Sequence, residues 1–318
     1  MSLRGGVDLG GTKIQVIVVD DDDKVVASSR RPTPTTGGPE DVAKEIIGAL
    51  EAAAGTASID LGTLTGIGIG SPGETDDAAG TISEARNLPG WEGTFPLASV
   101  VKEAVGPPVR LGNDVTVATT AEFARGAGEP YGSLLGVFWG TGVGGGLILD
   151  GKPWVGRGGA GEIGHMVVEL DGARCPCGRR GCMEAYAGRA AMETRARELV
   201  AKGHETDLFD LMKKHDRTRL TSGIWARALK KSDPLAEKLI DRAIAALGAG
   251  VASAVNLLDV EAVVIGGGLG DRLGQPYAER IAAAMLPHVF ADSRPPKVLV
   301  TTLGDLGGAL GAAMLVDG

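Results

Sequence analysis

Residues 161–186 read GEIGHMVVELDGARCPCGRRGCMEAY, and they contain all three cysteines of the chain. Cys175, Cys177 and Cys182 lie within eight positions, and His165 precedes them by ten residues. One imidazole and three thiolates form the ligand set of a closed tetrahedral zinc site. The alternatives are a zinc ribbon without contact to a substrate, or three unrelated buried thiols. The tight clustering favours zinc.

Two acidic residues bracket this cluster, Glu162 before it and Glu184 after it. A metal-bound loop holds its side chains in a fixed relation, because the ion ties several positions of the chain together. Carboxylates and an imidazole held in this way could recognise a ligand rich in hydroxyl groups.

The composition limits the classes of protein that fit. The chain has 318 residues, enough for two domains, with 43% hydrophobic and 23% charged residues, as in a soluble globular protein. No apolar run approaches the roughly 20 residues of a membrane span, and no signal peptide is apparent. A net charge of −8 and a pI near 5.2 argue against a nucleic-acid partner. With its thiols assigned to a metal, the chain is expected in the reducing cytoplasm.

The hydrophobic pattern predicts two α/β halves with a similar plan. Each half is expected to begin with a three-strand meander and to continue with alternating helices and strands. The expected strands are 6–9, 14–19, 24–29, 65–70, 109–111, 134–139, 147–149, 166–169, 262–265 and 297–301, and the expected helices are 40–54, 115–125, 234–258, 277–285 and one from 306. Paired halves of this kind usually bind their ligand in the cleft between them.

Glycine is over-represented, at 51 of 318 residues, and three clusters of it lie at strand ends. They are DLGGTK at 8–13, GTGVGGG at 140–146 and GGGLG at 266–270. Backbone N–H groups in such turns form concave nests that hold anionic oxygens, and Thr12 and Thr141 add hydroxyl donors. Each cluster alone could be a hairpin turn, but three together favour a nucleotide site.

Two familiar phosphate motifs do not fit. Residues 140–146 match the dinucleotide fingerprint, but that motif requires a helix directly after it, and 147–149 is strand-like. The Walker A spacing is absent, because Lys13 follows Gly10, Gly11 and Thr12 without the longer loop.

Three polar residues lie at the ends of expected strands of the first half. Asn113 and Asp114 stand between a strand and a helix, where they could cap the helix or where Asp114 could accept a proton from a substrate hydroxyl. Asp8 ends the first strand, where its carboxylate could hold Mg²⁺ or accept an Asx-turn hydrogen bond.

In this order, these motifs resemble the ROK family of sugar kinases and sugar-responsive repressors over nearly the whole chain, most closely its bacterial ATP-dependent glucokinases. DLGGTK looks like the first phosphate loop, GTGVGGG the second, VVIGGGLG at 263–270 the adenosine-side loop, and 161–186 the sugar- and zinc-binding signature. The resemblance implies a two-lobed, actin-like ATPase (ribonuclease H-like) α/β fold that binds sugar and nucleotide in the interlobe cleft. The small lobe would comprise 1–112 plus about 303–318, and the large lobe 113–302.

The resemblance also implies the roles of individual residues. Asp114 would be the general base, and Asn113, Glu162, His165 and Glu184 would bind the other sugar hydroxyls, with His165 also a zinc ligand. The residues implied to bind Mg²⁺-ATP are Asp8, Gly10, Gly11, Thr12, Lys13, Thr141, Gly142, Gly267 and Gly268.

The implied reaction is ATP-dependent phosphorylation of a hexose, foremost glucose to glucose 6-phosphate, with Zn²⁺ structural. The alternatives are a kinase for N-acetylglucosamine, N-acetylmannosamine, fructose or allose, the use of polyphosphate as donor, or a non-catalytic sugar-binding module. A repressor is disfavoured, because the first phosphate loop begins at Asp8 and leaves no room for a helix-turn-helix domain before it. Relatives imply a homodimer or homotetramer. The segment 202–231 shows no motif and is expected to be a surface insertion.

Overall fold

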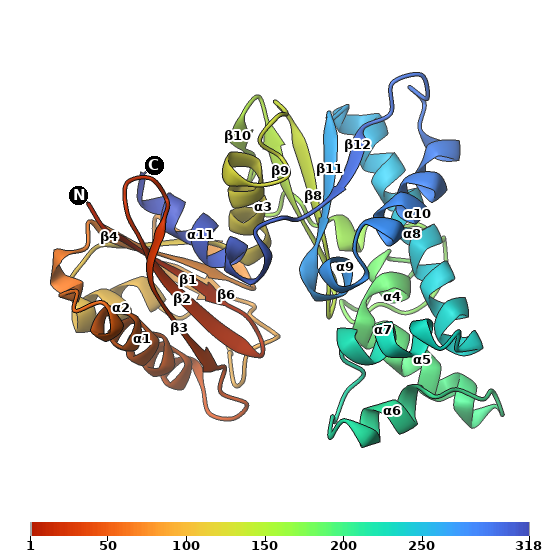
Figure 1. Ribbon diagram of the computed structural model, residues 1–318, viewed down its shortest axis with the longest axis horizontal. Coiled ribbons are helices and arrows are strands. Elements are labelled where there is room, and N and C mark those ends of the chain that lie inside the picture. Colours follow the sequence, from red (N-terminus) through yellow and green to blue (C-terminus); the bar gives the residue numbers. More distant parts are fainter. Residues whose placement is uncertain (1, 318) are drawn as a thin grey trace. The chain divides into compact units, whose positions relative to one another are not determined.

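The computed structural model describes residues 2–317, which form two compact α/β units (Figure 1). The first unit comprises Met1–Glu129, Pro153–Ala160 and Leu303–Gly318, and the second comprises Pro130–Lys152 and Gly161–Thr302. The expected division after residue 112 differs from this one at the helix α3 (Asp114–Arg125), which packs against a C-terminal helix of the first unit.

The first unit is built on a five-stranded mixed sheet of order β3-β2-β1-β4-β7. The outer hairpin strands pair antiparallel, whereas β1 with β4 and β4 with β7 pair parallel. The bounds are β1 (Arg4–Leu9), β2 (Lys13–Val19), β3 (Val25–Pro32), β4 (Gly66–Ser71) and β7 (Val109–Asn113), with a separate hairpin of β5 (Glu74–Asp76) and β6 (Thr81–Ser83). The helices are α1 (Pro39–Thr56), α2 (Leu97–Val105), α3 and α11 (Gly307–Ala313).

Helices cover both faces of this sheet, and β2 shows why. Its apolar side chains are buried all along the strand, and successive residues of a strand point to opposite faces. Val16 and Val18 join the core beneath α1, whereas Ile17 and Val19 join a second core that includes residues of α3 and α11. A continuous apolar run, rather than an alternating one, is typical of a strand covered on both sides.

Glycines allow α11 to approach the sheet and α3 very closely. A Cβ at Gly6 would collide with the carbonyl oxygen of Ala309, and a Cβ at Gly68 with that of Ala312. On the helix itself, a Cβ at Gly311 would collide with the carbonyl oxygen of Val117. These positions therefore require glycine for packing.

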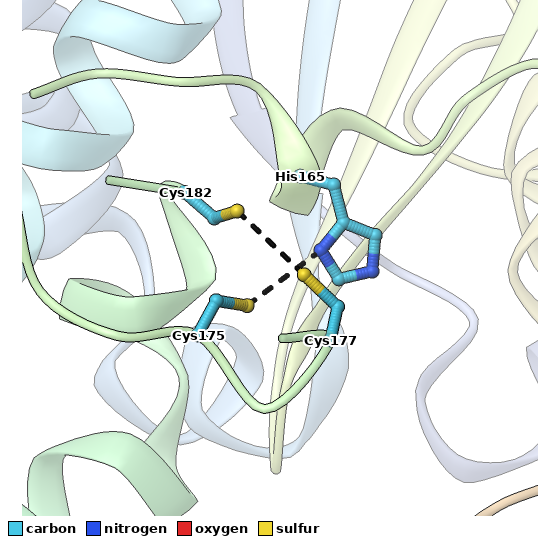
Figure 2. A group of neighbouring side chains, drawn as sticks. All are labelled: His165, Cys175, Cys177 and Cys182. Atoms are coloured by element: carbon cyan, nitrogen blue, oxygen red, sulfur yellow. Dashed lines mark hydrogen bonds between the residues drawn. The ribbon is translucent and has the colours of Figure 1, made fainter. Parts of the chain in front are cut away.

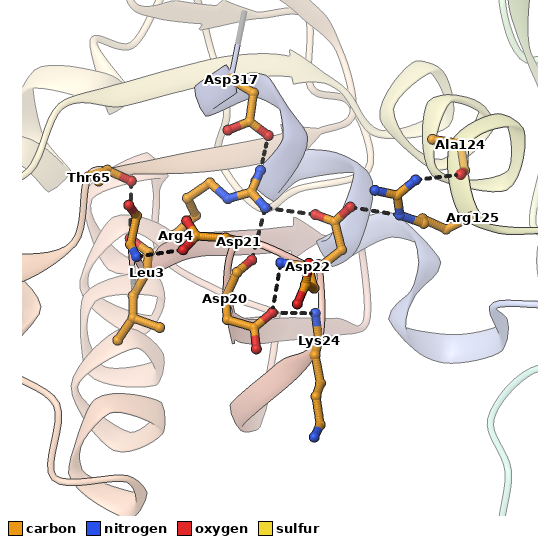
Figure 3. A network of polar contacts seen from close by, with 12 residues as sticks. Leu3, Arg4, Asp20, Asp21, Asp22, Lys24, Thr65, Ala124, Arg125 and Asp317 are labelled. Carbon is orange, nitrogen blue, oxygen red and sulfur yellow. Dashed lines mark hydrogen bonds and ion pairs between the residues drawn. The ribbon is translucent and has the colours of Figure 1, made fainter.

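A polar network ties the C-terminal segment to the edge of the sheet where β1 begins (Figure 3). The buried Arg4 pairs with Asp23 at 2.8 Å, donates to the Asp20 carbonyl at 3.0 Å and also contacts Asp317. Asp23 forms a second ion pair, because Arg125 Nε lies 2.9 Å from its Oδ2. This network lies at the opposite end of β1 from Asp8.

The second unit repeats the plan, with a five-stranded sheet of order β10-β9-β8-β11-β12. The strands are β8 (Leu134–Trp139), β9 (Val143–Leu149), β10 (Lys152–Pro153), β11 (Ala262–Gly266) and β12 (Lys297–Val300). The helices are α4 (Glu184–Ala187), α5 (Arg189–Ala201), α6 (Leu208–Lys214), α7 (Ser222–Lys230), α8 (Pro234–Leu258), α9 (Gly267–Leu273) and α10 (Gln275–Met285). The duplicated order confirms the prediction of two related halves.

One expected strand does not form. Residues 166–169 make only an isolated bridge from Val167 to Cys182, and the third strand of the meander is the short β10. A 3₁₀ turn at Ile163–His165 precedes the segment and directs the His165 ring toward the cysteines, so the side-chain cluster determines the path of the chain here. Residues 166–169 therefore lie beside the side-chain cluster and do not add a strand to the sheet.

Helix α8 is the only helix among residues 2–317 that is long and apolar enough to cross a membrane. Of its most apolar 18-residue window, 67% is buried inside the protein, where the helix packs against α4 and α10. Its apolar residues are therefore those of a core helix.

The expectation of a surface insertion at 202–231 is wrong. The segment contains α6 and α7, and Leu208, Leu220 and Trp225 are fully buried. The segment shows no motif because the apolar side chains of its helices pack in the interior, and such packing needs no ligand-binding pattern.

Candidate active site and metal centre

The first glycine cluster forms the tight turn between β1 and β2. The backbone N–H of Gly10 donates to the carbonyl of Lys13 at 2.9 Å, and the hydroxyl of Thr33 donates to the carbonyl of Gly10 at 2.6 Å. A Cβ at Gly11 would lie 3.0 Å from the carbonyl oxygen of Asn87. The hydrogen bond from Gly10 to Lys13 closes the turn, and the Asn87 carbonyl leaves little room for a side chain at Gly11.

Asp8 and Asp114 lie at the same edge of the first sheet. In the strand register, Asp8 pairs with Gly70, and Gly70 pairs with Gly112, two residues before Asp114. The parallel strands β1, β4 and β7 all end at this edge. Two strand spacings, about 10 Å, therefore separate β1 from β7. The predicted Mg²⁺ ligand and the predicted base thus belong to one edge of one unit.

Asn113 and Asp114 have different local roles. The side chain of Asn113 caps α3, because its Oδ1 accepts from the N–H groups of Val115 and Thr116 at 3.1 and 3.2 Å. Oδ1 of Asp114 accepts from the N–H of Val115 at 2.9 Å, and the Asp114 residue is partly exposed. The cap explains why α3 begins here and why Asp114 stands at its start.

Asp305 neutralises the cations beside the first glycine loop. Lys13 Nζ and Arg30 Nη2 each lie 2.8 Å from one of its carboxylate oxygens, and these hydrogen bonds lower the pKa of Asp305 to about 2. Burial raises the pKa of Asp8 even though Lys13 and Arg30 oppose that shift. Sequence reasoning missed Asp305, which is 292 residues from Lys13 and belongs to no motif.

The second and third glycine clusters meet within the second unit. A Cβ at Gly140 would lie 3.8 Å from the backbone nitrogen of Gly268. Gly267 has φ +81°, and a Cβ there would lie 2.9 Å from backbone atoms of Trp139. The turn between β8 and β9 is shorter than expected, because β9 already begins at Val143. The structure thus joins the two loops that the sequence predicted to bind one nucleotide.

The four predicted metal ligands converge (Figure 2). The ligand atoms of His165, Cys175, Cys177 and Cys182 all lie within 4.8 Å of one another. Cys177 Sγ and Cys182 Sγ are 3.8 Å apart, and Cys175 Sγ lies 3.9 Å from His165 Nδ1. Tetrahedral bonds of about 2.3 Å to zinc would place two sulfurs about 3.8 Å apart. The donor set and its spacing fit a structural zinc ion.

The cluster separates the pKa values of its thiols. Burial raises the pKa of Cys175 to about 12 and also raises that of Cys182. For Cys177, burial is opposed by hydrogen bonds from the Arg179 backbone and the neighbouring thiols, and the pKa falls to about 7. At least one ligand is therefore ready to bind a cation at neutral pH.

Each predicted sugar-binding acid of this unit contacts the cluster. His165 Nδ1 faces the thiols, which leaves Nε2 3.8 Å from Oε2 of Glu162. Glu184 Oε1 lies 3.9 Å from Cys175 Sγ, and its Oε2 accepts from the backbone N–H of Val143 at 2.9 Å. Glu162, His165 and Glu184 therefore gather around the cluster, whereas Asn113 and Asp114 belong to the other unit.

Comparison with known proteins identifies the family of this chain. The ROK family model matches residues 4–318. A glucokinase of Halalkalibacterium halodurans is 34% identical over 98% of this chain and 94% of its own length. An N-acetyl-D-glucosamine kinase of Erwinia tasmaniensis is 31% identical over 98% of both chains. The crystal structure of a ROK family glucokinase from Streptomyces griseus in complex with glucose and AMPPNP shares 32% identity and a TM-score of 0.84, covering 99% of both chains. The chain therefore belongs to the ROK family, and it is a glucokinase-like sugar kinase with the two-lobed α/β fold of that family.

Proposed function

We propose that the protein phosphorylates glucose with ATP to give glucose 6-phosphate. The observation that carries this proposal is the full-length similarity to the Streptomyces griseus glucokinase bound to glucose and AMPPNP. The residue set supports it, because the Asn113–Asp114 pair, both glutamates and His165 are all present in the family's order.

In the proposed mechanism, Asp114 accepts the proton of the sugar hydroxyl that attacks the γ-phosphorus. Its place at the start of α3 suits this role, since the side chain is partly exposed and its backbone is fixed by the Asn113 cap. General-base assistance of this kind contributes roughly 10²–10⁴ in rate. Most of the remaining acceleration comes from positioning and charge neutralisation.

Binding of the other hydroxyl groups falls to Asn113, Glu162, His165 and Glu184. His165 would bind zinc through Nδ1, and this bond would fix the ring so that Nε2 faces Glu162 and the sugar. When bound, zinc would orient these side chains and would supply no chemistry of its own.

The phosphates of the nucleotide are assigned to the glycine loops. Lys13, Thr12 and the N–H groups of Gly10 and Gly11 belong to the first loop, and the second unit adds Thr141, Gly142, Gly267 and Gly268. Asp8 would hold Mg²⁺ directly or through water, and the ion would neutralise charge on the phosphates. A cation beside the Asp8 carboxylate would lower its pKa and so oppose the effect of burial.

A second candidate is phosphorylation of an N-acetylhexosamine. The N-acetyl-D-glucosamine kinase of Erwinia tasmaniensis is nearly as similar as the glucokinases, at 31% identity. A coupled ADP-release assay decides between them, with glucose, N-acetylglucosamine, N-acetylmannosamine, fructose and allose as acceptors and ATP or polyphosphate as donors. We expect the highest kcat/KM for glucose with ATP. A higher value for an amino sugar or for polyphosphate would contradict the proposed substrate pair.

Two further properties are part of the proposal. We expect a cytoplasmic homodimer or homotetramer, which light scattering of the purified protein measures. We expect no specific DNA binding, and a gel shift with promoter fragments tests the repressor alternative.

A further inference from the structure

The second glycine loop lies against the N-terminus of α5. The backbone N–H of Arg189, the first residue of that helix, donates to the carbonyl of Gly140 at 3.1 Å. The next N–H, of Ala190, donates to the carbonyl of Thr141 at 3.0 Å. The backbone alone therefore brings the Arg189 side chain beside the loop.

The guanidinium of Arg189 joins three parts of the second unit. Its Nη2 donates to the hydroxyl oxygen of Thr141 at 2.6 Å, and its Nη1 donates to the carbonyl of Leu220 at 3.1 Å. Its Nε is buried and has no partner among residues 2–317. Leu220 leads into α7, and Ser222 at the start of α7 lies 3.4 Å from where a Cβ would stand at Gly268. Arg189 thus contacts the elements that surround both glycine loops.

The electrostatic surroundings of Arg189 are unfavourable for a cation. The N-terminus of a helix carries partial positive charge. Burial, together with the nearby Arg219, lowers the pKa of Arg189, although Glu193 opposes the shift. The Glu193 carboxylate is already engaged, because Arg197 lies 2.6 Å from one oxygen and the Leu220 N–H donates to the other at 2.9 Å. A half-buried cation without a carboxylate of its own is expected where an anionic ligand will neutralise it.

The direction of the hydrogen bond at Thr141 also points to a ligand. A guanidinium has no acceptor, so the Thr141 oxygen must accept and cannot donate in return. Within the described chain no acceptor receives the hydroxyl proton of Thr141. That proton remains available for an oxygen outside the protein, and a phosphate oxygen is a strong acceptor.

We propose that Arg189 is a positioning residue for the phosphates of the nucleotide. It fixes the Thr141 hydroxyl so that its proton is directed to a phosphate oxygen, and it adds positive charge beside the second glycine loop. This inference rests on the proposed ATP-dependent activity. A residue that only tied α5 to its neighbours would stabilise the fold without any effect on phosphate binding.

The test compares Arg189→Gln, Thr141→Val and the double variant with wild type. Arg195→Gln is the matched control, since Arg195 lies on the same helix, is exposed and pairs with Glu198 at 2.7 Å. Titration calorimetry with Mg²⁺ gives the Kd of ADP and of adenosine, which has no phosphate. Steady-state kinetics gives KM for ATP and for the sugar, and thermal unfolding gives stability without nucleotide.

We expect Arg189→Gln to raise the ADP Kd and the KM for ATP at least tenfold. The adenosine Kd and the sugar KM should stay within twofold of wild type, and Tm should be unchanged or higher because an uncompensated cation is removed. The ADP Kd of the double variant should be no more than twofold higher than that of the single variant that binds ADP more weakly. Arg189→Lys, which keeps the charge and N–H donors but loses the planar guanidinium fork, should recover part of the affinity.

Unchanged ADP affinity in Arg189→Gln, or an equal loss of adenosine and ADP binding, would overturn the inference. Full additivity of the two single variants would overturn the link through Thr141. If wild type itself neither binds ADP nor phosphorylates any sugar of the panel, the proposed function fails, and this result is distinct from a failure of the Arg189 assignment alone.

Discussion

The carboxylate of Glu184 accepts a hydrogen bond from the backbone N–H of Val143 at 2.9 Å, while its other oxygen lies 3.9 Å from Cys175 Sγ. A single side chain therefore contacts both the metal cluster and the strand that follows the second glycine loop. Gly142 is part of this contact, because a Cβ there would collide with the Glu184 carboxylate. Under the proposed function, this arrangement would couple the segment assigned to the sugar to the loop assigned to the phosphates.

Glu184→Ala should therefore raise KM for ATP as well as KM for the sugar. The variant leaves the Val143 N–H without its carboxylate acceptor, and a hydrogen bond to a charged group contributes about 1.5–3 kcal/mol. Steady-state kinetics with each substrate varied in turn measures both constants. Glu198→Ala, an exposed position of α5, is the control. A change in the sugar KM alone would show that the contact to Val143 has no role in the nucleotide site.

Removal of zinc should destabilise the second unit, and zinc affinity should fall steeply as the pH is lowered. Thiols bind zinc as thiolates, so zinc binding must displace the proton of Cys175, whose pKa is about 12, and that of Cys182, whose pKa is also raised. Two displaced protons correspond to about a 100-fold change in affinity per pH unit. Below the pKa of Cys177, about 7, the dependence should steepen.

Competition with a chromophoric chelator between pH 6 and pH 8.5 measures this slope, and mass spectrometry of the native protein gives the stoichiometry. We expect one zinc ion per chain in wild type and none in Cys175→Ala. Full activity and an unchanged Tm after the metal is stripped would contradict the structural role of the cluster.

Asp114→Asn should lower kcat at least 100-fold while the Kd of the sugar changes only a few-fold. The amide still hydrogen-bonds the substrate but no longer accepts its proton, and general-base assistance contributes roughly 10²–10⁴ in rate. Single-turnover kinetics and sugar titration calorimetry separate the two effects. Asp60→Asn is a suitable control, because Asp60 also caps a helical turn and lies at an exposed position. A near-normal kcat in Asp114→Asn would remove Asp114 as the base.

Asp305→Asn should cost less than about 1 kcal/mol of unfolding free energy at pH 7, because the pairs with Lys13 and Arg30 are largely exposed. The pKa of Asp305, about 2, lies below its ordinary value of 3.8. Its contribution is therefore present above about pH 4 and is lost as the pH falls toward 2, with about half remaining at pH 3. Urea unfolding of wild type and variant at pH 7 and pH 3 measures the difference. A difference in unfolding free energy between wild type and variant that is larger at pH 3 than at pH 7 would contradict the lowered pKa of Asp305.

Gly68→Ala and Gly55→Ala should have opposite effects on stability. At Gly68 a Cβ would collide with the Ala312 carbonyl, so the substitution should destabilise the fold by about 1–3 kcal/mol through overpacking. Gly55 lies near the end of α1, where a Cβ would meet no atom within 4 Å, and alanine there should stabilise by up to about 1 kcal/mol. Chemical unfolding of both variants checks the signs. Equal effects would contradict the close packing of α11 on the sheet.

Much of this architecture could be read from local patterns. Helix α8 has the predicted bounds of residues 234–258, and the hairpin and strand signals of both halves lie within a few residues of the observed strands. The zinc ligands were also predictable, because a metal site of three cysteines and a histidine requires those residue types close together in the chain. Such features depend on neighbours within a few residues, and the sequence displays those neighbours directly.

The strand expected at 166–169 shows the limit of such patterns. The segment is apolar and suited to a strand, but the metal cluster and the preceding 3₁₀ turn determine its path. A tertiary requirement overrides a local preference here, because propensities amount to only about 1 kcal/mol.

Sequence alone therefore determined the family, the two α/β halves and the chemical identity of the candidate site residues. Tertiary structure alone decided which of them meet. Asp305 reaches Lys13 across 292 residues, and Arg189 reaches Thr141 across 48. The physical reason is that hydrogen bonds and charges act over a few ångströms of space, whereas sequence patterns report only spacing along the chain.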